Sequence, residues 1–77
     1  MSGSEKEKPV ETLGEALPRE MKRVREVLLP QYISIGVPGL IGVAMMNAAL
    51  DRATKALAEG DLVAMIRAYE DLKGFTE

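Results

Sequence analysis

The feature that most constrains this chain is a run without charged side chains, residues 27 to 50 of 77. Its length alone meets the ~20 residues that a membrane-spanning helix needs. Pro30 and Pro38 interrupt the run, however, and a helix that begins after Pro38 reaches Asp51 before it is long enough to span. A buried connector followed by a helix start is therefore favoured over a segment that crosses a membrane or lies on its surface.

The glycines of this run, in the stretch QYISIGVPGLIGVAMM, allow a second interpretation. Gly36, Gly39 and Gly42 lie near a helix start, where free backbone N–H groups bind anions. A phosphate-binding loop also needs a preceding strand and a lysine, serine or threonine next to the glycines, and neither is present. We expect Gly36 at the N-cap, and Gly39 and Gly42 on one helix face that lets a neighbouring helix approach closely.

A chain this short forms one domain, which we place at residues 12–77, and buries a limited core. The sequence contains no Cys and no His. Disulfides, thiolate zinc sites and histidine acid–base catalysis are therefore excluded, and no cofactor or metal is expected. Stability must come from efficient helix packing or from association with another subunit.

Residues 1–11 are polar, with charges of alternating sign and one proline. Because such a segment buries little apolar surface, it is predicted to be a disordered tail. It also lacks the apolar stretch of a signal peptide, so we expect a cytoplasmic protein.

The first helix is predicted from about Pro18 to Leu28. The stretch TLGE at residues 12–15 matches a capping box, but Pro18 suits the first turn of a helix better than its interior. At most a short turn is expected before it. Pro30 should end this helix, because the residue before a proline avoids the helical region, and residues 30–37 should be irregular or extended.

Two further helices are predicted to form a tight αα-hairpin that packs with the first. The second runs from near Pro38 to about Glu59 and ends at Gly60, which can adopt the left-handed conformation. Asp61 then caps the third helix, residues 62–73, which Gly74 ends. The predicted fold class is all-α. The expected core consists of Val24, Leu28, Val43, Met46, Leu50, Leu57, Leu62, Ile66, Tyr69 and Leu72.

Carboxylates are the remaining candidates for acid–base chemistry. Each has a structural explanation, because Asp61 is a cap, Glu59 and Glu70 belong to solvated faces, and Asp51 is spaced to pair with nearby cations. The sequence therefore predicts a protein that is not an enzyme.

A basic cluster on the first helix supports an alternative function, a small nucleic-acid-binding protein. Its members are Arg19, Lys22, Arg23 and Arg25. Glutamates interleave with them, no aromatic residue is nearby to stack on a base, and the net charge of the chain is −2. A solvated face with internal ion pairs is favoured over nucleic-acid binding.

Surplus apolar side chains favour a protein partner. Ile41 and Met45 lie on a different side of the second helix from its core positions, and Val63 does the same on the third helix. Since exposed apolar surface on a small protein indicates a partner, we expect an interaction module that forms a homodimer around the second helix. The expected partner or dimer contacts are Ile41, Met45, Val63, Arg19 and Arg23.

The string IGVPGLIGVAMM, followed by ALDRATKALAEGDLVAMIRAYEDLKGF, resembles small uncharacterised helical proteins encoded by bacteriophages and prophages. The resemblance covers roughly residues 27–75, although Pro38 falls one residue later than in that pattern. It implies an accessory protein that binds a host protein and modulates it, and it implies no catalytic residues.

Overall fold

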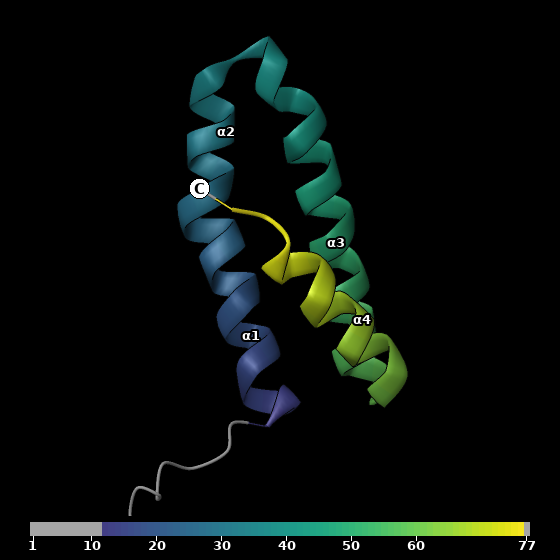
Figure 1. Cartoon of the computed structure of the whole chain (residues 1–77). Coiled ribbons are helices and arrows are strands. Elements are labelled where there is room, and N and C mark those ends of the chain that lie inside the picture. The colour runs from purple at the N-terminus through teal and green to yellow at the C-terminus, as the bar shows by residue number, and fades with distance from the viewer. Residues whose placement is uncertain (1–11, 77) are drawn as a thin grey trace, which may run out of the picture.

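The computed structural model describes residues 12–76, and within that range every regular element is helical (Figure 1). The elements are α1 (Leu13–Arg23), the π-helical turn η1 (Val24–Leu28), α2 (Leu29–Ile35), the 3-10 turn η2 (Val37–Gly39), α3 (Leu40–Glu59) and α4 (Leu62–Lys73). Because α1, η1 and α2 follow one another without a break, the fold consists of three helices, as predicted. The tail predicted for residues 1–11 lies outside the described residues.

The first helix begins at Leu13, five positions earlier than predicted. Thr12 is its N-cap, and the backbone N–H of Thr12 donates to the Glu15 carboxylate at 3.3 Å, as in a capping box. Pro18 lies inside the helix. Its missing N–H leaves only the carbonyl of Gly14 without a helical partner, and Gly14 is exposed to water, so the cap outweighs the proline.

Pro30 does not end the first helix, so the prediction of an irregular connector at residues 30–37 is wrong. The π-helical turn immediately before Pro30 widens the helix, and the Leu29 N–H donates to the Val24 carbonyl five residues back. A π turn changes the usual four-residue hydrogen bonding where the proline ring would meet the carbonyl of Glu26. The helix therefore continues through α2 to Ile35.

The end of the second helix and the start of the third match the predictions. Gly60 has φ 66° and ψ 25°, the left-handed conformation expected at the end of α3. The Asp61 carboxylate accepts a hydrogen bond of 3.2 Å from the Ala64 N–H and caps α4. Gly74 follows the last residue of α4, but it has φ −70°, so this helix ends without a left-handed glycine.

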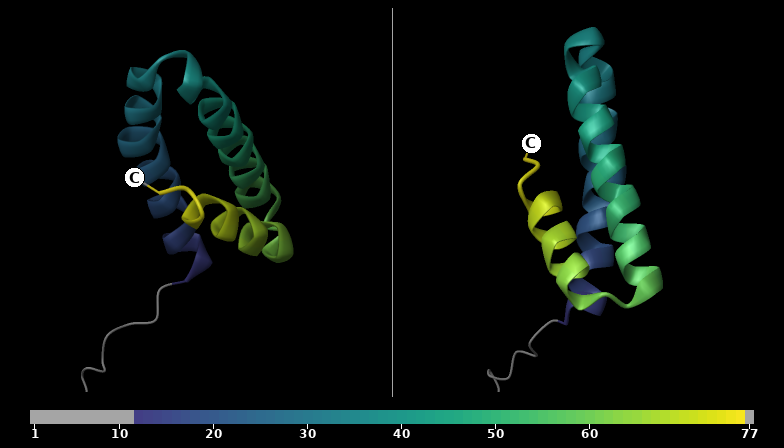
Figure 2. Two further views of the ribbon diagram at one scale, coloured as in Figure 1. Left: turned by 45° about the horizontal axis from the view of Figure 1, so that its top comes forward. Right: turned by 90° about the vertical axis from the view of Figure 1, so that its right-hand side faces the viewer.

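The three helices form two layers over only part of their length. The helix made by α1, η1 and α2 runs beside α3, and α4 packs against α1 and α3 (Figure 1). The right-hand view of Figure 2 shows α4 on one side of this pair, away from the turn that joins α2 to α3. The end formed by α2 and the first half of α3 is therefore a single layer.

The core lies where α1, η1, α3 and α4 meet, and most of the predicted core residues are there. Leu62 and Ile66 are exceptions because they are exposed, and Val43 is an exception because it is only partly buried and lies outside the core cluster. The buried residues of α4 are Ala68 and Leu72. Helix α4 faces the core with Ala68, because the small side chains of Ala49, Ala53 and Ala68 allow α3 and α4 to approach closely. The buried core cluster consists of Leu17, Met21, Val24, Leu28, Met46, Ala49, Leu50, Ala53, Ala68 and Leu72.

Candidate interaction surface

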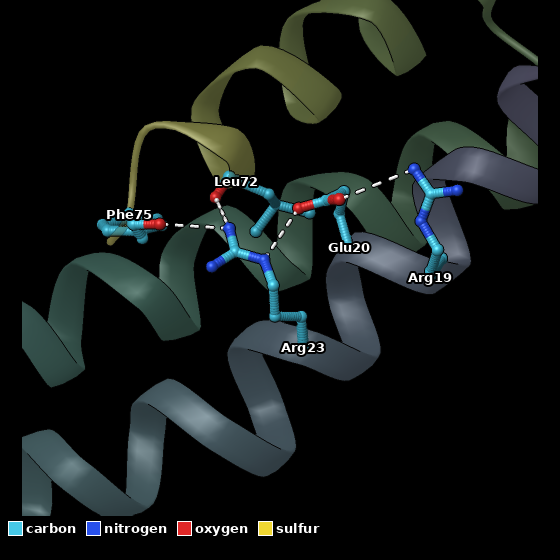
Figure 3. Close-up of polar contacts among 5 residues, drawn as sticks. All are labelled: Arg19, Glu20, Arg23, Leu72 and Phe75. Carbon is cyan, nitrogen blue, oxygen red and sulfur yellow. Dashed lines mark hydrogen bonds and ion pairs between the residues drawn. The ribbon is translucent and has the colours of Figure 1, made fainter. Parts of the chain in front are cut away.

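Arg23, predicted as a partner contact, joins α1 to the end of α4 (Figure 3). Its Nη2 donates to the backbone carbonyls of Leu72 and Phe75, each at 3.0 Å, and its Nε donates to Glu20 at 2.9 Å. A cation at a helix C-terminus stabilises the carbonyls that lack helical partners. Arg23 therefore caps the C-terminal end of α4, where the sequence predicted a glycine cap at Gly74. Arg23 is thus a structural residue.

The basic cluster is correspondingly less suited to nucleic acid. Arg19 lies 3.7 Å from the same Glu20 carboxylate that binds Arg23. A guanidinium that holds two backbone carbonyls and a carboxylate has few donors left for a phosphate. The geometry therefore adds no support to the alternative of a nucleic-acid-binding protein.

Replacing Arg23 with alanine is expected to lower the free energy of unfolding by about 2 kcal/mol, because charge-assisted hydrogen bonds to α4 are lost. Chemical denaturation followed by circular dichroism measures this. Arg25→Ala is the matched control, since Arg25 is exposed on the same helix and its loss should change the stability by less than ~0.5 kcal/mol. Equal losses in the two variants would show that the link between α1 and α4 contributes nothing.

Ile41 and Met45, two other predicted contacts, share one exposed side of α3. Their side chains are 74% and 56% exposed. Ala48 and Arg52 continue the same side at three- and four-residue spacing. Met45 and Ala48, which follow Ile41 along α3, line an open groove between α3 and the end of α4. Phe75 lies on the opposite wall of this groove. The structure thus brings Ile41 and Met45 together.

Val63 lies at the other end of the α3–α4 contact. It is 60% exposed and lines a second groove with Ala56 and Ala64. The two grooves meet at Arg52 and Asp71, whose side chains form an ion pair of 3.5 Å. Val63 therefore does not belong to the surface that contains Ile41.

The turn between α2 and α3 exposes apolar residues that were expected to be buried. The prediction of a buried connector is wrong, because Val37 is 80% exposed and Ile33, Ile35 and Leu40 are each more than half exposed. Residues 27–50, here called the uncharged end, carry these side chains as well as Ile41 and Met45. The part of the uncharged end that α4 does not cover thus presents apolar surface to solvent.

The glycines of this end hold α2 and α3 in close contact, as the sequence predicted for Gly39 and Gly42. A Cβ on Gly42 would lie 2.5 and 2.7 Å from two ring carbons of Tyr32, and a Cβ on Gly39 would overlap the Tyr32 carbonyl oxygen. The prediction of Gly36 at the N-cap of the second helix is wrong, because Gly39 is the N-cap of α3, and Gly36, with φ 90°, makes the turn between α2 and η2. These glycines are therefore explained by packing and turn geometry.

Other site chemistry receives no support within residues 12–76. In that range no three acidic side chains are grouped so that they could hold a metal ion. None of the helices described there is long and apolar enough to cross a membrane. The interaction surface remains the candidate that the geometry favours.

Comparison with known proteins finds no matching family model, curated protein or solved structure for this chain.

Proposed function

We propose that this protein is a non-enzymatic interaction module that binds another protein through its uncharged end. The observation that carries the proposal is the exposure of Ile33 and Ile41 beyond the part of the fold that α4 covers, with the exposed Met45 at the edge of that part. Domains are built from packed layers because each apolar helix face must be buried against another element. These exposed isoleucines and the methionine would therefore be buried only when a partner binds.

The composition of the surface suits a protein partner. Contiguous exposed apolar side chains are typical of interaction sites, and methionine adapts its shape to a partner. The adjoining core is packed against α4, and Arg23 links α1 to α4. The uncharged end therefore extends from a well-packed part of the fold. The resemblance to small phage and prophage proteins supports the same role, since it implies that binding modulates a host protein.

Capture of partners from the native host with tagged protein tests this proposal. Met45→Glu should reduce recovery of specific partners roughly tenfold or more, because a carboxylate would be desolvated in an apolar interface. Asn47→Glu is the control, since Asn47 is also exposed in the uncharged end but lies on a different side of α3. Identical recovery with wild type, Met45→Glu and Asn47→Glu would exclude this surface.

A further inference from the structure

Helix α3 carries two apolar seams on different sides. One consists of Met46, Ala49, Leu50 and Ala53, and α1, η1 and α4 bury it. The other consists of Ile41, Ala44, Met45 and Ala48, all exposed, and is here called the outer seam. Both have the three–four spacing with which one helix packs along another. The outer seam is thus spaced like a helix contact, but among the described residues it meets only the end of α4, across the open groove at Met45 and Ala48.

We propose that the outer seam pairs with the outer seam of a second copy, in an antiparallel arrangement about a two-fold axis between Ala44 and Met45. This inference rests on the proposed function, because it names the partner of the same surface. In such an arrangement, α3 of one copy packs along α3 of the other, and each copy covers the outer seam that the other exposes.

The register of the outer seam favours pairing with itself. With the axis between Ala44 and Met45, Ile41 of one copy faces Ala48 of the other, and Met45 faces Ala44. Each large side chain therefore meets a small one, as two-fold contacts require when the same surface serves both partners. A seam with large residues at every position would not interdigitate in this way.

The charge distribution points to the same partner. A two-fold contact places a surface against itself, so any charge on the surface would approach a like charge near the axis. The outer seam avoids this, because the nearest charged residues along α3 are Asp51 and Arg52, beyond its lower end. Arg52 is also held by Asp71 within the same chain.

The size of the surface sets the strength of the dimer. The outer seam spans residues 41–48 of α3, which is about 12 Å along a helix about 10–12 Å wide, so its area is on the order of 100 Å². Stable interfaces bury about 800 Å² on each partner, so contact through this face gives a weak, reversible dimer.

Two other occupants are less well matched. Residues 1–11 of the same chain carry lysines and glutamates, which do not complement an uncharged apolar surface. A lipid surface would surround the uncharged end on all sides, whereas a second copy contacts only the outer seam. Substitutions on different sides of α3 therefore distinguish lipid from protein.

Light scattering after size-exclusion chromatography tests the dimer between ~1 µM and ~1 mM, the range in which weak association is measured. The molar mass of the wild type should rise from 8.4 kDa toward twice that value with concentration. Met45→Glu should remain at 8.4 kDa throughout, while Asn47→Glu should behave as the wild type. Circular dichroism of each variant confirms that it is folded.

A wild type that stays monomeric to ~1 mM overturns the dimer. If Met45→Glu nevertheless loses captured host proteins, the proposed function stands and only the second copy is excluded. A dimer that persists in Met45→Glu overturns the assignment of the outer seam. Flotation with phosphatidylcholine vesicles that both Met45→Glu and Asn47→Glu abolish, without a dimer, assigns the uncharged end to lipid and overturns the proposal.

Discussion

Gly39→Ala is expected to destabilise the protein by about 3 kcal/mol, the upper part of the range for overpacking a closed site. Gly39 is buried, and an added Cβ would overlap the Tyr32 carbonyl oxygen and lie 3.0 Å from the Tyr32 carbonyl carbon. Because the obstacle is backbone, the strain is relieved only if α2 moves away from α3. Urea denaturation followed by far-ultraviolet circular dichroism measures the loss.

Gly14→Ala is the matched control for this substitution. Gly14 lies in α1, and the nearest neighbouring atom to an added Cβ is the Thr12 hydroxyl oxygen at 3.7 Å. Alanine is the better helix former, so Gly14→Ala should raise stability by ~0.5–1 kcal/mol. If Gly39→Ala also raised stability, the close contact between α2 and α3 would be wrong.

Leu72→Ala is expected to cost about 3–4 kcal/mol, the typical loss when a fully buried leucine leaves a cavity. Leu72 is fully buried in the core cluster where α4 meets α1 and α3. The substitution should lower the urea midpoint strongly without changing the slope of the denaturation curve, since the folded state keeps its extent.

Leu62→Ala tests the same helix on its exposed side. Leu62 is 60% exposed, so its truncation should change stability by no more than ~0.5 kcal/mol. Spacing alone predicts both Leu62 and Leu72 in the core. The two variants show which of these side chains contributes to stability. Comparable losses of stability in Leu62→Ala and Leu72→Ala would mean that α4 faces the core with the side that carries its large apolar residues, as spacing predicts.

The end of α3 and the start of α4 could be predicted because their signals are local. Gly60 needs only its own conformational freedom to end α3, and Asp61 caps α4 through an N–H three residues away. The packing role of Gly39 and Gly42 was also predictable, since small residues at a helix start allow close approach. The exact partner, Tyr32, was not, because it lies in a segment that was predicted to be irregular.

The first helix extends beyond its predicted bounds because proline rules describe local preferences. Pro18 and Pro30 each disfavour the helical interior, but a helix with both a cap and a buried apolar face gains more than one missing hydrogen bond costs. Leu17, just before the predicted helix, and Leu28, its last residue, are both fully buried. The π-helical turn before Pro30 is the local adjustment that keeps this face continuous, and spacing gave no sign of it.

The side of α4 that faces the core and the role of Arg23 depend on tertiary structure. Hydrophobic spacing gives weight to large residues, whereas the contact of α3 with α4 is set by alanines such as Ala53 and Ala68. Arg23 binds carbonyls 49 and 52 residues away, and only its ion pair with Glu20 was readable as an i, i+3 spacing. The exposure of Ile41 and Met45, by contrast, followed from their position outside the core stripe.

Cysteine crosslinking of the outer seam tests the central claim most directly, because the sequence has no cysteine of its own. In Ala44→Cys, the two thiols would lie beside the two-fold axis, within the ~7 Å between Cα atoms that a disulfide allows. Ala58→Cys places a thiol on another exposed position of α3, far from the axis. Mild oxidation should link Ala44→Cys into covalent dimers rapidly and leave Ala58→Cys as monomers; equal, slow crosslinking of both variants would contradict the pairing of the outer seams.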